Sequence, residues 1–408
     1  MTRLTKESKA LLIVSMLLTA GMVIVGTFIN VFLLRATDGN VSLIIIQNMI
    51  VFITLWIAFV GGSKLLAKIS ITTLLRLGLL SMALYFTLIL LLQNHLATFL
   101  VPLAIFNGLG SGLYWFATNL LIAKVIEETE QGRYFGYQQT SGSILGVITP
   151  AVSGFVITRF TDLTGYYILF GIALIFFTLA ILMSKSISGF TSTRKIQIYD
   201  VLKLKGNRHW NAGKTFRFVI SLKEAINGQV FMLFAFLIFQ NEGVIGNIVS
   251  AAALITIFSS LWFARTYSRK NQQPFYLSTA TIMMLMYLLL ALFPYVPVLI
   301  AAWIVFGIIQ SWAATILPSV IFQLASRAKG GYEQNDYLVA LEFPTTLGRI
   351  VGLAVALLLI HFIDSNMNVY RLLFVIIATC WILEYIIIEK QVKWFRDELP
   401  IEKVSNTC

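Results

Sequence analysis

Apolar residues are gathered into twelve long runs, and polar residues lie mainly in the gaps between them. A helix needs roughly 20 residues to cross the hydrocarbon of a bilayer. Helices are expected throughout, because an open strand edge leaves backbone groups unsatisfied in lipid. The pattern therefore predicts an all-α membrane protein with twelve transmembrane helices. The runs cover residues 10–34, 42–62, 74–93, 97–123, 138–159, 165–184, 222–240, 244–264, 276–295, 298–325, 337–363 and 370–388.

Lysine and arginine avoid every second gap between these runs. When a basic residue at the edge of a run is counted with the adjoining gap, 26 of the 30 lie at the two ends of the chain or after even-numbered runs. Arg35, Arg159 and Arg371 lie in the alternate gaps, and Arg349 lies within a run. Basic residues favour the cytoplasmic side of a membrane. The distribution predicts a multi-pass protein of the plasma membrane with both termini in the cytoplasm.

A long basic gap divides the runs into six and six. Its basic side chains are expected to lie on anionic lipid headgroups. The division predicts two pseudo-symmetric six-helix bundles, with an N-terminal bundle over residues 1–184, a cytoplasmic linker over 185–221, and a C-terminal bundle with its tail over 222–408. The compact loops favour a bacterial membrane.

The composition leaves little room for a globular domain outside the membrane. Hydrophobic residues make up 58% of the chain and charged residues 12%, whereas soluble domains carry about 25% charged residues. The formal charge of +12 is spread over short gaps beside apolar runs. This placement favours the lipid bilayer as partner and argues against nucleic acid. Two cysteines, Cys380 and Cys408, make no disulfide framework.

The two halves carry a faint internal repeat. An offset of 206 residues aligns Phe135–Gly146 in the fifth run with Leu341–Gly352 in the eleventh, and it pairs Thr140 with Thr346. Transporters are often built from duplicated halves that enclose a site near the membrane midplane. The small residues and prolines of these two runs are expected to let the helices flex. They are Gly142, Gly146, Pro150, Gly154, Pro344, Gly348 and Gly352.

Six plus six runs, a basic central gap and this repeat resemble the major facilitator superfamily of secondary transporters over essentially the whole chain. Between its second and third helices that family carries an Asp four residues after a Gly. Here Leu66 follows Gly62 at that spacing, with Lys64 and Lys68 beside it. The fifth run is similar to the Gly/Pro pattern of family exporters, without its Gly-Pro pair. The resemblance implies a carrier that works by alternating access, and not an enzyme.

Few charges lie inside the runs, and a charge at the bilayer centre costs roughly 2.5–3.5 kcal/mol. Glu342 and Arg349 are seven residues apart, which places them about 10.5 Å apart on nearly one helix face. We expect Arg349 to bind an anionic or carbonyl group of a substrate, or else to belong to a packing network. Glu342 is expected to pair with Lys64 or Lys68 as a cytoplasmic gate, and Glu342 or Glu384 is a candidate for proton coupling.

Polar and aromatic side chains occur within the other runs. A pathway lined by them would suit an amphipathic or neutral polar ligand, although each alone is also a typical interhelical hydrogen-bonding residue. The substrate-pathway candidates are Asn30, Asn107, Tyr114, Trp115, Asn119, Gln310 and Trp312.

The remaining motifs exclude some functions. His95, His209 and His361 have no metal-ligand spacing, so no metal or other cofactor is expected, and no phosphate-binding loop supports an ATP-driven pump. We expect export of an amphipathic small molecule, with protons as the exchanged ion. The alternatives are uptake of a sugar or other small nutrient, movement of a lipid-linked molecule, and a non-transporting receptor on the same fold.

Overall fold

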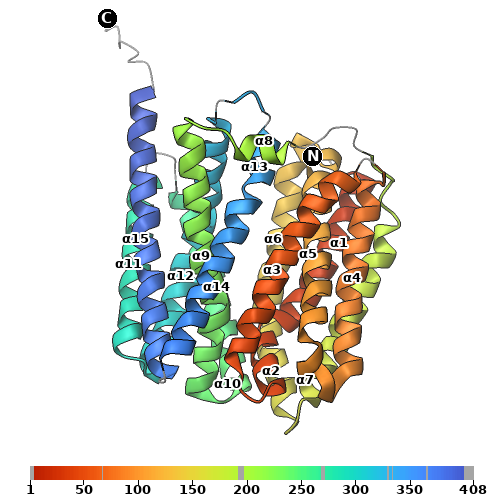
Figure 1. The fold of residues 1–408 in the computed structure, drawn as a ribbon, viewed down its shortest axis with the longest axis vertical. Helices are drawn as coiled ribbons and strands as arrows, with labels where there is room; N and C mark the ends of the chain where they lie inside the picture. Colours follow the sequence, from red (N-terminus) through yellow and green to blue (C-terminus); the bar gives the residue numbers. More distant parts are fainter. Residues whose placement is uncertain are drawn as a thin grey trace, which may run out of the picture.

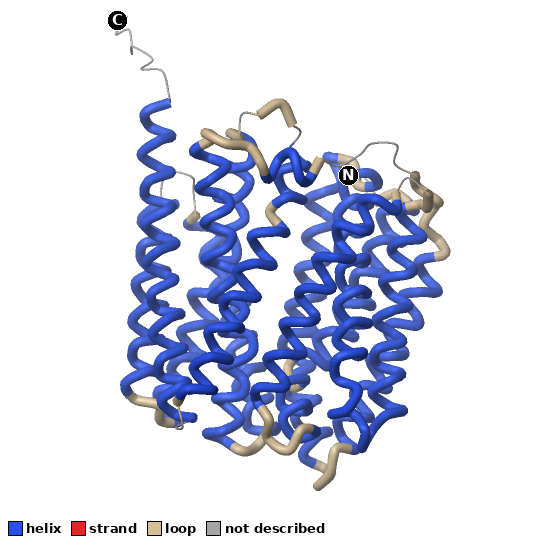
Figure 2. Tube along the Cα trace, viewed as in Figure 1, coloured by secondary structure: helices blue, strands red, loops and turns tan. Residues whose placement is uncertain are grey.

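The computed structural model describes residues 4–66, 68–191, 197–267, 272–328, 330–332, 334–363 and 366–398. Within these ranges all regular structure is helical, as Figure 2 shows. The first half contains α1 (Lys6–Gly26), α2 (Ile29–Ala36), α3 (Val41–Leu65), α4 (Ile71–Leu92), the 3-10 helix η1 (Gln93–Phe99), α5 (Leu100–Val125), α6 (Glu128–Thr158) and α7 (Thr164–Ser184). The short helix α8 (Ile198–Leu202) follows.

The second half repeats this plan with seven further helices. They are α9 (Arg208–Phe239), α10 (Glu242–Thr266), α11 (Gln272–Leu292), α12 (Val296–Ser326), α13 (Gln334–Ala340), α14 (Glu342–Phe362) and α15 (Asn366–Glu398). Twelve helices among the described residues are long and apolar enough to cross a membrane, as predicted. Figure 1 shows them as two bundles side by side, with both termini at one end. We call that end the terminal face and the other end the opposite face.

Several helices begin where a polar side chain can bond their first free backbone N–H groups. Thr5 caps α1 by accepting from the N–H of Ser8, and Ser70 caps α4 by accepting from Thr73. Asn207 does the same for α9 through the N–H of Trp210. These caps fix where the three helices begin.

Three runs differ from the helices that the sequence predicts. The first run is broken, because α1 ends at Gly26 and α2 begins at Ile29. The seventh begins at Arg208, so helix α9 extends well into the segment 185–221 that was expected to be linker. Residues 192–196 of that segment and Cys408 lie outside the described residues.

The eleventh run is divided into α13 and α14 at Leu341. Pro344 lies in the first turn of α14, where its missing N–H costs no helical hydrogen bond. The proline therefore separates the two helices and does not kink a continuous one.

The bundles meet through two helix pairs that are equivalent under the internal repeat. Helix α6, the fifth span, packs on α10, the eighth, and α14, the eleventh, packs on α3, the second. A Cβ atom on Gly154 would lie 2.5 Å from the carbonyl oxygen of Glu242, and one on Gly246 would lie 2.3 Å from that of Pro150. Glycine is required at both positions, because the backbones of α6 and α10 touch there.

Short helices cover part of the terminal face. The indole N–H of Trp210 donates to the carbonyl oxygen of Val201 at 2.9 Å, and its ring lies 5.1 Å from that of Tyr337. Val60 of α3 joins this small apolar cluster. The cluster therefore connects α8, α9 and α13 to the N-terminal bundle.

Candidate functional site

Helix α14 is held tightly against α9 by two glycines. A Cβ atom on Gly348 would lie 2.3 Å from the carbonyl oxygen of Phe218, and one on Gly352 would lie 2.7 Å from that of Leu222. Small residues permit this approach between membrane helices. The contact sets Arg349 beside the central turns of α9.

Arg349 reaches from the C-terminal bundle onto the N-terminal one. Its Nη1 lies 3.4 Å from Oε1 of Glu342, and the two side chains are 22% and 21% exposed. Its Cζ lies 4.9 Å from the ring centroid of Phe52 on α3. Because 3.4 Å is a long hydrogen bond and a guanidinium has five N–H donors, Arg349 keeps donors for another acceptor.

The expected gate between Glu342 and the lysines is not formed in this conformation. Lys64 and Lys68 are exposed, and among the described residues Glu342 forms its ion pair with Arg349. The ring of Phe343, next to Glu342, lies 5.6 Å from that of Trp56 on α3. Contact between α3 and α14 at this level is therefore aromatic.

A second ion pair lies wholly inside the C-terminal bundle. Lys223 Nζ of α9 lies 2.7 Å from Oε1 of Glu384 on α15 and donates to its Oε2 at 2.8 Å. The hydroxyl of Tyr276 on α11 donates to the same Oε2 at 2.6 Å. The Lys223 and Glu384 side chains are 6% and 0% exposed. Nζ also lies 3.2 Å from the ring centroid of Trp381, a cation–π contact.

The sequence interpretation missed Lys223 because it placed this residue at the edge of the seventh run. In the structure Lys223 lies about 22 Å along α9 from Arg208. A signal was present upstream of the run. Asn207 is a typical N-cap residue, and Phe216, Val219 and Ile220 follow at the i, i+3, i+4 spacing of a helix.

A cavity of about 150 Å³ adjoins this ion pair between α9, α11, α12 and α15. Glu224 lines it, is exposed, and forms no ion pair with another residue of the described ranges. Asn227 accepts from the hydroxyl of Tyr287 at 2.8 Å. The lining residues are Lys223, Glu224, Asn227, Met283, Tyr287, Gln310, Ala313, Ala314, Leu317 and Trp381. The wall thus combines both signs of charge with amides and aromatic rings.

The predicted pathway residues of the C-terminal half occupy two different places. Gln310 lines the cavity beside Lys223. The indole N–H of Trp312 donates to Ser259 Oγ at 3.0 Å, and its ring stacks on Phe263 at 5.8 Å. Gln310 therefore belongs to the candidate site, and Trp312 to the packing of α12 on α10.

The predicted pathway residues of the N-terminal half are dispersed. Tyr114 is buried, and its ring contacts the exposed ring of Trp115 at 5.3 Å. Asn107 accepts from the Ser111 hydroxyl at 3.5 Å, and Asn119 is exposed. These side chains do not form one cluster with the C-terminal charges.

Asn30 instead takes part in a contact between the bundles. Its side-chain amide donates to the carbonyl oxygen of Gly228 at 3.3 Å, and nearby Asn48 donates to Gln229 Oε1 at 3.0 Å.

The repeat glycines of α6 differ from those of α14, since a Cβ atom on Gly142 or Gly146 would meet no atom within 4 Å.

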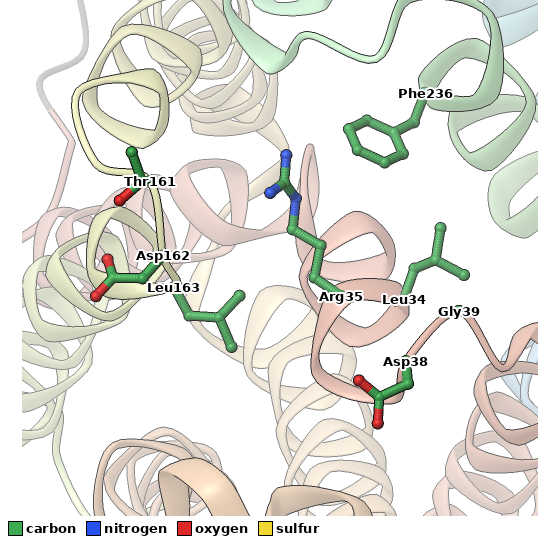
Figure 3. A pocket seen from close by; sticks show the side chains of 8 residues that line it. All are labelled: Leu34, Arg35, Asp38, Gly39, Thr161, Asp162, Leu163 and Phe236. Carbon is green, nitrogen blue, oxygen red and sulfur yellow. The ribbon is translucent and has the colours of Figure 1, made fainter.

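An ion pair joins the bundles at the opposite face. Arg35 Nη2 lies 2.6 Å from Glu242 Oε1, and the Tyr166 hydroxyl donates to that oxygen at 2.7 Å. Arg35 also lies over the ring of Phe236, with its Cζ 5.2 Å from the centroid. Figure 3 shows the Arg35 side chain extending between Phe236 and the α6–α7 loop that carries Asp162.

Two surface cavities of about 510 and 550 Å³ flank Arg35. Asp38 and Asp162 line the first. The backbone N–H of Thr164 donates to Asp162 Oδ1 at 3.0 Å and holds the pKa of that carboxyl below its ordinary value. The opposite face is therefore a charged surface around a closed contact between the bundles.

Two pseudo-symmetric six-helix bundles, charged side chains at mid-depth and a closed end define the class of secondary carriers that work between two bundles. The chain belongs to the Major Facilitator Superfamily, whose sequence profile matches residues 11–241. It is therefore a multi-pass membrane protein and a secondary transporter, since members of this family are typically carriers.

One relative spans most of the chain, and solved structures share its fold. The chain is 24% identical to "Uncharacterized protein YqgE" of Bacillus subtilis (strain 168) over 361 residues, or 88% of this chain and 84% of that protein. A POT family transporter bound to a thioalcohol-conjugated peptide superposes with a TM-score of 0.72 at 13% identity, covering 95% of this chain and 96% of that one.

An inward-facing bacterial homologue of the iron transporter ferroportin superposes with a TM-score of 0.71 at 12% identity, covering 95% of this chain and 99% of that one. The nucleoside transporter NupG gives a TM-score of 0.67 at 14% identity, covering 95% of this chain and 100% of that one. At these identities the likeness concerns the fold alone.

Proposed function

We propose that this chain is a proton-coupled carrier of a small amphipathic molecule. The observation that carries the proposal is the buried Lys223–Glu384 pair beside a cavity. An ionisable pair inside a membrane bundle is costly and marks an ion or substrate pathway. Glu384 is the titratable group through which a proton would be bound and released.

The lining of the mid-depth region supports an amphipathic substrate. Trp381 and Tyr287 offer aromatic surface, Asn227 and Gln310 offer amide groups, and Glu224 offers an exposed charge. Binding sites with a largely apolar wall and a few placed polar groups orient such ligands. Arg349, with donors left over, is the second candidate for contacting the polar end of the substrate.

The proposed orientation puts the terminal face in the cytoplasm of a bacterial cell and the opposite face outside. The excess of basic residues on the terminal face supports it. In this orientation the Arg35–Glu242 pair closes the outer end. Transport then requires this contact to break while the α3–α14 contact at the inner end closes further.

Export in exchange for protons is the direction that the sequence favours, and we retain it as the first candidate. Uptake together with protons is the second, and a specific observation favours it. The carboxylate of Glu384 is paired with the ammonium of Lys223. Protonation of Glu384 would therefore leave that ammonium free to bind an anionic group of the substrate.

Purified protein in liposomes tests the function. An imposed pH gradient, a pH-sensitive dye inside the vesicles and a library of small amphipathic compounds should reveal compounds that move protons only when the protein is present. Alkalinisation of a vesicle by an inwardly directed compound indicates exchange, and acidification indicates uptake with protons. Compound flux that does not depend on the pH gradient would contradict proton coupling.

A further inference from the structure

The ammonium of Lys223, on α9, lies beside side chains of α11 and α15. It contacts both carboxylate oxygens of Glu384, at 2.7 and 2.8 Å, and the face of Trp381. Tyr276 holds Glu384 in place from the third helix through a 2.6 Å hydrogen bond. Because Glu384 is fully buried, Lys223 is the cation that balances its charge.

The same ammonium borders the cavity of about 150 Å³. A cavity of about this volume holds one benzene-sized ring. Lys223 is therefore the point where a buried ion pair and a ligand-sized space meet. An anionic group entering from the cavity would approach Lys223, the one cation among the described residues of its wall.

Charge balance limits how such a group can bind. If an anion contacts Lys223 while Glu384 is ionised, two negative charges share one ammonium, and the Glu384 carboxylate is fully buried. Leaving a buried charge uncompensated costs several kcal/mol. If Glu384 first takes a proton, the anion replaces its carboxylate on Lys223, and the ammonium is paired with one buried negative group before and after.

Resting on the proposed proton-coupled function, we propose that Lys223 is the binding residue for a carboxylate or similar anionic group of the substrate, and that this group binds only with a proton on Glu384. In the exchange, the Lys223–Glu384 ion pair plus one proton and one anion become a Lys223–anion pair and a neutral Glu384 acid. No covalent bond other than the O–H bond is made or broken. Proton and anion then occupy the same state and cross the membrane in the same direction, so this inference selects the second candidate, uptake together with protons, over exchange.

The ionisable groups around Glu384 are few. Helix α9 contributes Lys223 and Glu224, α11 contributes Tyr276, and α15 itself contributes Cys380 one turn away. Tyr276 can remain hydrogen-bonded to the neutral acid, because a carboxylic acid keeps an acceptor oxygen. Glu224 is exposed at the cavity wall, so it is the rival proton site that an experiment has to separate from Glu384.

Three probes of one shape and different charge test the proposal: benzoate, benzamide and benzamidine. Binding to the full-length protein in detergent is measured as a rise in unfolding temperature above about pH 5.5, where benzoate stays ionised. Benzoate should bind, and its affinity should fall about tenfold per pH unit once Glu384 is ionised, because one proton is taken up per anion. Equal binding of benzamide or benzamidine, or no binding of any probe, overturns the proposal.

Variants identify which residue takes up the proton and which residue binds the anion. Glu384→Gln mimics the neutral acid, so benzoate should bind it without pH dependence. The double variant Lys223→Met/Glu384→Gln removes both charges together, which avoids an unpaired buried ion, and it should lose benzoate. Benzoate binding retained by the double variant would overturn the proposal. Loss of the pH dependence in Glu224→Gln would also do so, by placing the proton on Glu224.

The liposome assay separates this inference from the function on which it rests. If the double variant Lys223→Met/Glu384→Gln still shows proton-driven flux, the carrier function is supported, but Lys223 is not the binding residue for the substrate. Absence of proton-driven flux in the unaltered protein would remove the proposed coupling, whatever benzoate does in detergent.

Discussion

Arg35 Nη2 lies 2.6 Å from Oε1 of Glu242, and the two residues belong to different bundles. The contact is reinforced from both sides, because Tyr166 of the N-terminal bundle donates to Glu242 and Phe236 of the C-terminal bundle lies under Arg35. Glu242 is 3% exposed and Arg35 is 36% exposed. The opposite face cannot open while these four side chains keep their partners.

Glu242→Gln should therefore favour opening of the opposite face. Because Arg35 is partly in water, the pair is expected to contribute about 1 kcal/mol, which corresponds to a shift of about fivefold in population. Spin labels at the exposed positions Thr161 and Leu237, one on each bundle, should show a larger fraction of long distances. Asp38→Asn is the matched control, since Asp38 lines a surface cavity together with Arg35 and forms no ion pair with any described residue. An unchanged distance distribution in Glu242→Gln would show that the pair does not hold this end closed.

Arg349→Gln should lower proton-driven transport about tenfold, which corresponds to about 1.4 kcal/mol. The change removes the charge that faces Glu342 and the stacking on Phe52. Arg349→Lys keeps the charge and should retain an intermediate rate, because lysine lacks the planar guanidinium. Initial rates in liposomes measure both variants, with the exposed Arg371→Gln as control. Normal turnover in both Arg349 variants would show that the residue serves packing alone.

Gly348→Ala should destabilise the protein, whereas Gly142→Ala should not. The added Cβ atom at position 348 would lie 2.3 Å from a backbone oxygen, but at position 142 it meets nothing within 4 Å. Overpacking of this kind typically costs about 1–3 kcal/mol, while alanine is the better helix former at an open position. Unfolding temperatures in detergent compare the two. Equal temperatures would mean that α14 and α9 adjust freely around the new methyl group.

Lys64→Glu should impair transport, and adding Glu342→Lys should restore it, if the two residues pair when the terminal face closes. In the present conformation Glu342 faces Arg349, so the exchange of partners would belong to the closing movement. Transport by the single and double variants is compared with Lys64→Gln, which removes the charge without reversing it. A double variant no better than Lys64→Glu would count against the gate. The same pair of changes at Lys68 identifies which lysine takes part.

The membrane orientation can be tested with single cysteines in a background without Cys380 and Cys408. A cysteine at Lys205, on the terminal face, should react with a membrane-impermeant maleimide only after the cells are permeabilised. A cysteine at Asp162, on the opposite face, should react in intact cells. The reverse pattern would invert the orientation and, with it, the inner and outer ends of the pathway.

Hydropathy and the alternation of basic residues predict the fold well, because each spanning helix must satisfy its own backbone in lipid. The twelve spans and the two bundles follow from this local requirement. The break between α1 and α2 does not, since Thr27 and Phe28 interrupt the helix without a proline or a charge. Gly26 ends α1, but glycine is frequent within membrane helices, so it does not by itself predict a break.

The site was only partly predictable for a related reason. Glu342 and Arg349 lie on one helix, so their spacing alone placed them on one face. Arg35 and Glu242 are 207 residues apart in sequence and sit at the ends of runs, where charges are ordinary. Their pairing depends on how the two bundles pack against each other, and no local sequence pattern predicts that packing. Lys223 was missed through an error in one helix boundary.

The contact between Lys223 and Trp381 gives the protein a built-in optical reporter. An ammonium 3.2 Å from the ring centroid perturbs the excited state of that indole, and its departure should change both the colour and the intensity of the emitted light. A variant in which Trp381 is retained and the other seven tryptophans are replaced by phenylalanine would let spectroscopists follow the ion pair in real time, during turnover, without attaching any dye.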